Sequence, residues 1–237
     1  MTEPKFWVVV PAAGVGRRFG GDQPKQYYPL NGKTVAEWTL SRLLSVSRVA
    51  GCVVAISDAD QHWAKLGIND SRVILTTGGA ERSDTVYQGL LALTELASPN
   101  DWVLVHDIAR PCVRAADIER MMDALAVDAV GGILAAPMAD TVKRVSGGNC
   151  IAATEDRSQL WAAMTPQMFR YSLLRDALLQ AKNKDFQPTD ESSAVEQLGV
   201  SPKVIAGQRD NIKITNREDL AIAEAILQVQ IQQKEDH

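Results

Sequence analysis

The chain has 237 residues, 46% of them hydrophobic, and carries a formal net charge of −4 at neutral pH. This size and apolar content suffice for one large α/β domain, so we expect a single domain over residues 1–237, and the negative charge argues against binding of nucleic acid. No apolar run approaches the ~20 residues of a membrane-spanning helix and the first residues show no signal-peptide core, which predicts a cytoplasmic protein without membrane contact.

The first predicted strand, residues 6–10, runs into a loop of small and basic residues that reads PAAGVGRRFGG from position 11. Small residues after a buried strand let backbone N–H groups approach an anion, and Arg17, Arg18 and Lys25 can neutralise a polyphosphate. Neither common phosphate fingerprint fits, because Phe19 replaces the third small residue of a dinucleotide loop and no P-loop Gly-Lys-Ser/Thr follows. A tight turn with a solvated basic rim is the alternative; we favour a nucleotide loop of a different kind.

Further apolar runs alternate with helical stretches along the chain. The predicted strands cover residues 52–56, 72–76, 102–105 and 132–136. Thr34 and Glu37 have capping-box spacing, a stripe within residues 81–97 predicts a buried helix face, and a last helix is expected to begin near Asn216. Near-continuous apolar strands that alternate with helices predict an α/β fold whose parallel sheet is covered by helices on both faces.

Residues 138–158 break this pattern. They read as two short extended segments, 141–145 and 150–154, joined by the turn sequence Ser-Gly-Gly-Asn. An isolated two-stranded hairpin is marginally stable in water, so this β-hairpin arm needs a surface to lie on. We expect it to clasp a second copy of the chain, which predicts a homodimer.

Polar residues gather where the predicted strands end, and ligands of open α/β sheets bind at that edge. Asp107 follows the strand 102–105 beside His106, with Arg110 three residues on. Asp107 could cap the helix near Ala115 or pair with Arg110. We favour a carboxylate that holds Mg²⁺ or a ribose hydroxyl at a phosphate site, since hard cations prefer oxygen ligands.

Residues farther along the chain add groups that could bind anions, among them Arg157, Thr165 and Lys213. Thr189 taken alone reads first as a helix N-cap. Residues 211–214 look like a strand, on which Lys213 faces either solvent or a site. Several cations without an evident activated Ser, Cys or His nucleophile favour direct displacement at phosphorus, with Mg²⁺ balancing the nucleotide phosphates.

These motifs together resemble the 2-C-methyl-D-erythritol 4-phosphate cytidylyltransferases of the non-mevalonate isoprenoid pathway, nearly end to end. The Pro-Ala-Ala-Gly loop alone is shared with many nucleotidyltransferases, whereas the ordered combination is specific. The residues that carry the resemblance are those at 11–18, 24–27, 105–111, 140–141, 156–157, 160–161, 165–167, 189–191 and 211–213.

The resemblance implies that CTP and methylerythritol phosphate are the substrates, that a cytidine diphosphate alcohol and pyrophosphate are the products, and that the fold is a Rossmann-like mixed sheet with a dimerising arm. It implies that Arg18 and Lys25 stabilise the transition state and that Arg157 and Lys213 orient the attacking phosphate. The implied nucleotide-binding residues are Pro11, Ala12, Ala13, Gly14, Gly16, Gly79 and Thr85.

The resemblance also implies a second group of residues around the acceptor and the metal. The substrate residues are Asp107, Arg110, Thr141, Arg157, Thr165, Thr189 and Lys213, and the Mg²⁺ ligands are Asp107 and Asp210. Thr141 and Arg157 are expected to reach a site of the neighbouring subunit.

Two positions depart from the family pattern, since Ile108 stands where Ala is common and Thr85 where Ser is common. Three other readings stay open: a cytidylyltransferase for another polyol phosphate such as ribitol phosphate, a nucleotide-binding regulator without catalysis, and a dinucleotide-binding oxidoreductase. Arg18 and Lys25 argue against the regulator, and the missing third glycine argues against the oxidoreductase.

Overall fold

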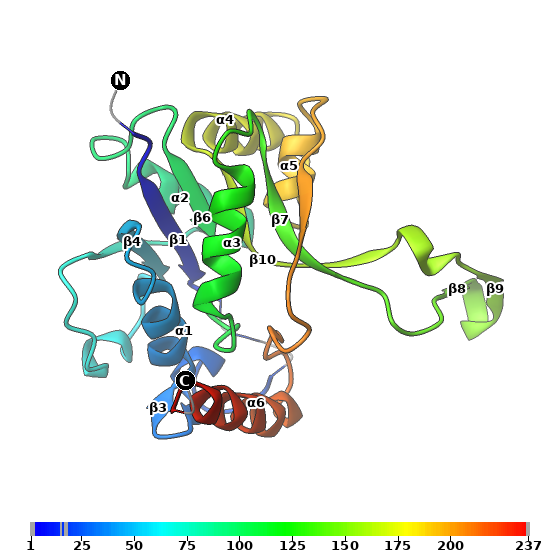
Figure 1. The fold of residues 1–237 in the computed structure, drawn as a ribbon, viewed down its shortest axis with the longest axis horizontal. Helices are drawn as coiled ribbons and strands as arrows, with labels where there is room; N and C mark the ends of the chain where they lie inside the picture. The colour runs from blue at the N-terminus through cyan, green and yellow to red at the C-terminus, as the bar shows by residue number, and fades with distance from the viewer. Residues whose placement is uncertain (1–2, 15, 17–18, 236–237) are drawn as a thin grey trace.

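The computed structural model describes residues 3–14, 16 and 19–235, so the predicted Arg18 lies outside the described residues. A seven-stranded sheet forms the centre of the molecule, in the order β11-β7-β10-β6-β1-β4-β5 (Figure 1). Its strands are β1 (Phe6–Ala12), β4 (Val49–Ile56), β5 (Val73–Thr77), β6 (Trp102–Val105), β7 (Gly131–Pro137), β10 (Trp161–Arg170) and β11 (Lys203–Ala206).

The sheet is mixed, because one strand runs against its neighbours. Strand β1 pairs in parallel with β4 and β6, and the β4–β5 and β11–β7 pairs are parallel as well. Strand β10 lies antiparallel between β6 and β7. The five predicted strands of the sheet are therefore confirmed, and so is the mostly parallel mixed sheet that the family resemblance implied.

Helices cover both faces of the sheet, which confirms the predicted fold class. They are α1 (Val35–Leu44), α2 (Arg82–Leu91), α3 (Ala115–Leu125), α4 (Tyr171–Asn183), α5 (Glu191–Glu196) and α6 (Glu218–Glu235). Alternate residues of β1 separate the two layers: Val8 packs in the core beneath α1 and α3, and Val9 packs in the core beneath α2, α4 and α5. Helix α6 packs in a third cluster with the buried Phe19.

The helix starts follow the local rules read from the sequence. Thr34 and Glu37 form the predicted capping box, in which each side chain bonds the backbone N–H of the other. Helix α2 ends at Leu91, before the predicted position 97, although Leu93 is still buried. Helix α6 begins at Glu218, and the backbone N–H of Asn216 donates to Asp219.

Short elements complete the chain and include the predicted hairpin. They are β2 (Pro29–Leu30), β3 (Lys33–Thr34), β8 (Lys143–Val145), β9 (Ile151–Thr154) and the 3₁₀ turns η1 (Lys25–Tyr27), η2 (Trp63–Lys65), η3 (Gly147–Asn149) and η4 (Arg157–Gln159). Strands β8 and β9 pair antiparallel in a sheet of their own, which projects from the body beyond β7 and β10 (Figure 1). Within the described part of the chain, no helix is both long and apolar enough to cross a membrane.

Two local predictions were wrong. Residues 211–214 form no strand, because their backbone groups pair with the loop after β6: Ile214 donates to the carbonyl of Ala109, and the carbonyl of Asn211 accepts from Arg110. Thr189 is not the N-cap of α5. Asp190 takes that position, since its carboxylate accepts from the backbone N–H of Ser193.

Candidate active site

A cavity of about 250 Å³ opens at the carboxyl end of β1, between the loops that follow β1, β5 and β6. This is the edge where an open α/β sheet places its ligands. Lys25, Asp107 and Lys213 line it. All of the predicted nucleotide-binding residues line it as well, namely Pro11, Ala12, Ala13, Gly14, Gly16, Gly79 and Thr85. The structure thus brings together side chains from five separate stretches of the sequence.

Two side-chain hydrogen bonds from η1 hold the loop after β1. The buried Gln26 side chain donates to the carbonyl of Ala12 at 2.9 Å, which ties η1 to the end of β1. The Lys25 ammonium donates to the carbonyl of Ile214 at 2.6 Å. Gly16 adopts φ +64°, a left-handed conformation that favours glycine. Lys25 therefore links the segment after the β1 loop to residues 211–214 beside the cavity.

The loop after β5 approaches the start of α2 so closely that it needs glycine. A Cβ atom on Gly79 would lie 2.4 Å from Cβ of Asp84. The Thr85 hydroxyl accepts from the N–H of Gly79 at 3.1 Å and donates to the carbonyl of Glu81 at 2.9 Å. Ser, which is common at position 85 in the family, also carries a hydroxyl. The hydroxyl that Thr85 retains therefore fixes the conformation of this loop.

Asp107 is the centre of the charge arrangement. Its Oδ1 accepts from Nε of Arg82 at 3.0 Å, and its Oδ2 lies 2.7 Å from Lys213 Nζ and 3.6 Å from Arg110 Nε. Burial by itself would raise the pKa of Asp107, but the neighbouring cations Arg82, Lys213 and Arg110 lower it well below its ordinary value. Asp107 is therefore ionised at neutral pH. Its predicted alternative as a cap of α3 is wrong, because Arg114 occupies the N-cap position.

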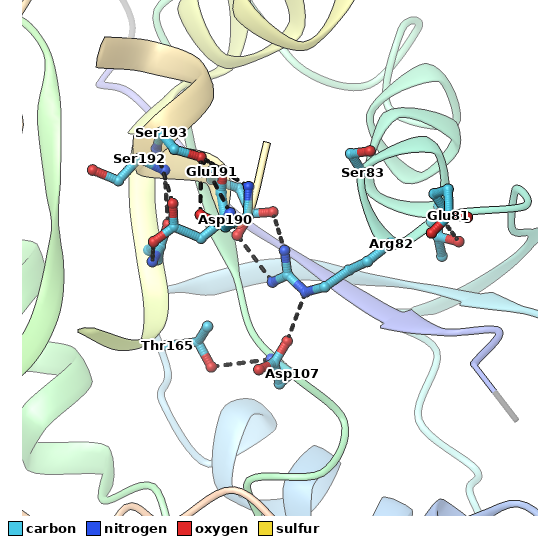
Figure 2. Close-up of polar contacts among 12 residues, drawn as sticks. Glu81, Arg82, Ser83, Asp107, Thr165, Asp190, Glu191, Ser192 and Ser193 are labelled. Carbon is cyan, nitrogen blue, oxygen red and sulfur yellow. Dashed lines mark hydrogen bonds and ion pairs between the residues drawn. The ribbon is translucent and has the colours of Figure 1, made fainter. Parts of the chain in front are cut away.

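A second carboxylate, which the sequence reasoning did not assign, completes this cluster. The guanidinium of Arg82 binds both carboxylate oxygens of Glu191, at 2.6 and 3.0 Å, so that Arg82 bridges Glu191 and Asp107 (Figure 2). Glu191 is only 1% exposed. Burial would lower the pKa of Arg82, but the two carboxylates raise it above its ordinary value. The sequence signal for this ion pair was that Arg82 lies in the polar run that follows the predicted strand 72–76.

A second cavity of about 230 Å³ adjoins the first and shares Arg82, Asp107 and Lys213 with it. Its other lining residues are Arg110, Ala163, Met164, Thr165, Gln167, Thr189 and Asp190. Five of the predicted substrate residues therefore meet here, namely Asp107, Arg110, Thr165, Thr189 and Lys213. The two cavities therefore meet at the three charged side chains that they share.

Thr165 binds the backbone of Asp107. Its hydroxyl accepts from the backbone N–H of Asp107 at 3.1 Å and lies 3.1 Å from Nδ1 of His106 (Figure 2 shows the contact of Thr165 with Asp107). His106 is fully buried, and burial lowers its pKa to about 4. A neutral imidazole at neutral pH cannot supply a cation to the site. Its two ring nitrogens contact Thr165 and the carbonyl of Arg110, each at 3.1 Å, and so link β10 to the loop after β6.

The remaining predicted residues lie elsewhere. Thr141 and Arg157 belong to the segments that flank the hairpin; both are exposed, and Arg157 donates to the carbonyl of Ala139. Neither is among the described residues that line the two cavities. Asp210 is not among them either: its Oδ2 accepts from Nε of Arg114 and from Gln230, both at 3.0 Å. These contacts anchor the 210–214 segment and give no support to the metal role predicted for Asp210.

The sheet order, the small-residue loop after β1 and the paired cavities with converging cations define a nucleotidyltransferase of the α/β class. The model of the 2-C-methyl-D-erythritol 4-phosphate cytidylyltransferase family matches residues 6–229. The chain belongs to this family.

Individual relatives agree with that assignment. The chain is 48% identical over 221 residues to the 2-C-methyl-D-erythritol 4-phosphate cytidylyltransferase of Aliivibrio fischeri strain MJ11, covering 93% of this chain and 92% of that protein. It is 47% identical to the protein of that name from Pseudomonas putida strain GB-1, covering 92% and 94%. A crystal structure of a 4-diphosphocytidyl-2C-methyl-D-erythritol synthase aligns with a TM-score of 0.83 at 38% identity, over 95% of this chain and 100% of that one.

Proposed function

We propose that the chain transfers CMP from CTP to 2-C-methyl-D-erythritol 4-phosphate in the non-mevalonate pathway of isoprenoid biosynthesis. The products are 4-diphosphocytidyl-2-C-methyl-D-erythritol and pyrophosphate. A phosphate oxygen of the acceptor forms a new bond to the α-phosphorus of CTP, and the bond from that phosphorus to the bridging oxygen of pyrophosphate breaks. The bonding electrons leave with pyrophosphate, so no redox partner is needed.

The observation that carries this proposal is the pair of adjoining cavities. The predicted nucleotide residues line the first cavity, which we call the nucleotide cavity. Predicted substrate residues line the second, which we call the acceptor cavity, and Arg82, Asp107 and Lys213 line both. A direct displacement needs two substrates held in line at one phosphorus and cations around it. Two adjoining cavities beside a group of cations support this reaction, which requires no covalent intermediate on the protein.

Each cation has a role in this proposal that follows from its place. Lys25 lies in the wall of the nucleotide cavity, where its ammonium would neutralise negative charge that develops on the α-phosphate. Arg18 would act beside it as proposed from the family resemblance. Lys213 and Arg110 line the acceptor cavity and would orient the attacking phosphate. Asp107 holds these two cations in place before substrate binds.

Mg²⁺ belongs to the proposal as well. Among the described residues, no group of three or more His, Cys, Asp or Glu side chains could hold a metal alone. Mg²⁺ usually needs only one or two carboxylates together with substrate phosphates. Asp107 lines the nucleotide cavity and would hold Mg²⁺ in addition to the cations Arg82 and Lys213 that its two oxygens already contact. When bound, Mg²⁺ would balance the charge of the triphosphate. A role for Asp210 stays a prediction.

We also infer that the chain is a single-domain, cytoplasmic protein that acts as a homodimer joined through the β8–β9 arm. Apolar side chains on and beside the arm are exposed in the single chain: Val145, Ile151, Leu160 and Trp161. Burying them against a second copy would supply the surface that an isolated hairpin lacks. The same contact would carry Thr141 and Arg157 toward the partner's acceptor cavity.

The function is tested by incubating the purified protein with CTP, Mg²⁺ and one acceptor at a time, and measuring pyrophosphate release. We expect turnover with methylerythritol phosphate to exceed turnover with ribitol 5-phosphate, with ATP, GTP and UTP as nucleotide controls. Faster turnover of ribitol 5-phosphate would reject the proposed acceptor. No release with any acceptor, together with CTP binding, would favour a regulator.

Light scattering tests the dimer. The full chain is expected to have the mass of two subunits at micromolar concentration, and a variant with residues 141–155 replaced by a short Gly-Ser linker is expected to be a monomer. A full chain that is already monomeric, or a linker variant that still dimerises, would contradict the role of the arm.

A further inference from the structure

Arg82 occupies an electrostatically unfavourable position for a cation. It is the first residue of α2, where the partial positive charge of a helix N-terminus disfavours a basic side chain. Its guanidinium nevertheless makes three hydrogen bonds to two carboxylates, Asp107 and Glu191 (Figure 2). These contacts, rather than the helix, hold Arg82 in place.

The bridge joins three parts of the chain: the start of α2 at Arg82, the loop after β6 at Asp107, and α5 at Glu191. Arg82 belongs to the segment with Gly79 and Thr85, which lines the nucleotide cavity. Glu191 begins α5, directly after Thr189 and Asp190, which line the acceptor cavity. Arg82 itself lines both. Arg82 therefore links the loop after β5 to α5 and to Asp107 through one planar group.

The bridge also fixes the rotation of the Asp107 carboxylate. With Oδ1 bound to Arg82, Oδ2 is the oxygen that meets Lys213 at 2.7 Å. If Arg82 released Oδ1, only the contacts of Oδ2 with Lys213 and Arg110 would hold the carboxylate, and the partner of Lys213 would be less constrained. The position of the cation that would meet the acceptor phosphate thus depends on Arg82, although Arg82 need not touch that phosphate.

We propose that Arg82 is a positioning residue that couples the two cavities, so that nucleotide bound in the first raises the affinity of the second for the acceptor phosphate. The inference rests on the proposed function, since it concerns the two substrates of that reaction. By thermodynamic linkage, the acceptor raises the affinity for the nucleotide by the same factor.

The coupling is measured as a ratio of dissociation constants in the full-length protein. Calorimetry gives the Kd of methylerythritol phosphate alone and in the presence of the α,β-methylene analogue of CTP with Mg²⁺, which binds without transferring CMP. We expect the nucleotide analogue to tighten acceptor binding by a factor within the roughly 5- to 150-fold range typical of coupled sites.

Three variants test the bridge. Arg82→Gln removes the charge, Glu191→Gln keeps the shape of the partner without its charge, and Arg82→Lys keeps a charge that cannot bind both carboxylates in a planar fork. In each of them the ratio is expected to fall to within about twofold of one. Arg120→Gln is the matched control, because Arg120 pairs at 2.7 Å with the buried Asp117 and lies outside the described lining of both cavities. It should keep the wild-type ratio.

The outcomes separate the coupling from the function. If the wild-type protein turns over CTP but its ratio is one, the coupling is refuted and the function stands. If it neither binds CTP nor releases pyrophosphate, the proposed function fails first. Folded Arg82→Gln and Glu191→Gln proteins with the wild-type ratio would overturn the inference, and should Arg82→Gln not fold, Glu191→Gln and Arg82→Lys decide alone. A wild-type ratio in Arg82→Lys would show that charge suffices and would overturn the bridge.

Discussion

Replacing Gly79 by Ala tests whether the close approach between the loop after β5 and helix α2 sets the shape of the nucleotide cavity. The added Cβ would lie 2.4 Å from Cβ of Asp84, whereas ordinary contact begins at 3.4 Å. The two segments must therefore separate by about 1 Å, the difference between these distances. The backbone of Asp84 lies behind that contact, at 3.1 and 3.3 Å, so no flexible side-chain end can absorb the shift.

The displaced residues include lining groups of the cavity, because Asp84 lies between Arg82 and Thr85 in the first turn of α2. A misplacement of about 1 Å can reduce catalysis by on the order of 10²-fold. We expect kcat/KM for CTP to fall by about that factor, mainly through a higher KM. Overpacking should also lower the free energy of unfolding by about 1–3 kcal/mol.

The assay is pyrophosphate release with varied CTP at saturating acceptor, combined with chemical unfolding in urea. Gly67→Ala is the control, since the nearest atom to its added Cβ is Oε1 of Glu37 at an ordinary 3.9 Å. A Gly79→Ala protein whose kcat/KM for CTP stays within twofold of wild type would show that the cavity does not depend on this contact.

Three further predictions follow from the same site. Lys25→Gln should lower kcat by about 10²–10³-fold in steady-state assays with little change in KM, as for a group that acts in the transition state, and a change confined to KM would contradict this role. Asp107→Asn removes a buried charge with cationic partners and should reduce the free energy of unfolding at pH 7 by about 3–5 kcal/mol in urea. Because the folded-state pKa of Asp107 is lowered, its stabilising contribution is present above the unfolded value of about 4 and is lost as the pH falls through the lower folded value, so the two proteins should converge in stability in strong acid; a pH-independent difference would refute the assignment. Thr85→Val leaves the N–H of Gly79 without its hydroxyl acceptor and should cost about 1–3 kcal/mol of unfolding free energy, and an unchanged urea midpoint would count against this contact.

The parts of the fold that the sequence predicted well are those in which local pattern and tertiary environment agree. Strand β6 is a continuous apolar run between polar residues, and its bounds are those predicted. The capping box of α1 is likewise written into four consecutive residues. Because loops after parallel strands meet at one edge of the sheet, the nucleotide-loop residues and Asp107 could be expected to converge without any knowledge of distances.

The missed elements lack such a local signal. Strand β10 contains Thr165, Pro166 and Gln167, which interrupt its apolar character, and β11 is a four-residue edge strand. The segment 211–214 has the composition of a strand but bonds to a loop instead. The bridge from Arg82 to Glu191 joins residues 109 positions apart, and only the packing of α5 against α4 and the sheet reveals it.

Strand β10 connects the projecting hairpin to the centre of the sheet. Its first residue, Trp161, pairs with Pro137 at the end of β7, and the same strand continues through the middle of the sheet to Arg170 (Figure 1). The projecting hairpin is therefore carried at the end of the β7–β10 pair, and backbone bonds from Met138 to Leu160 and from Glu155 to Val142 continue the pairing toward β8 and β9. Strand β10 also contributes Ala163, Met164, Thr165 and Gln167 to the second cavity, so inserting or deleting one residue within β10 would displace the arm and this cavity wall together.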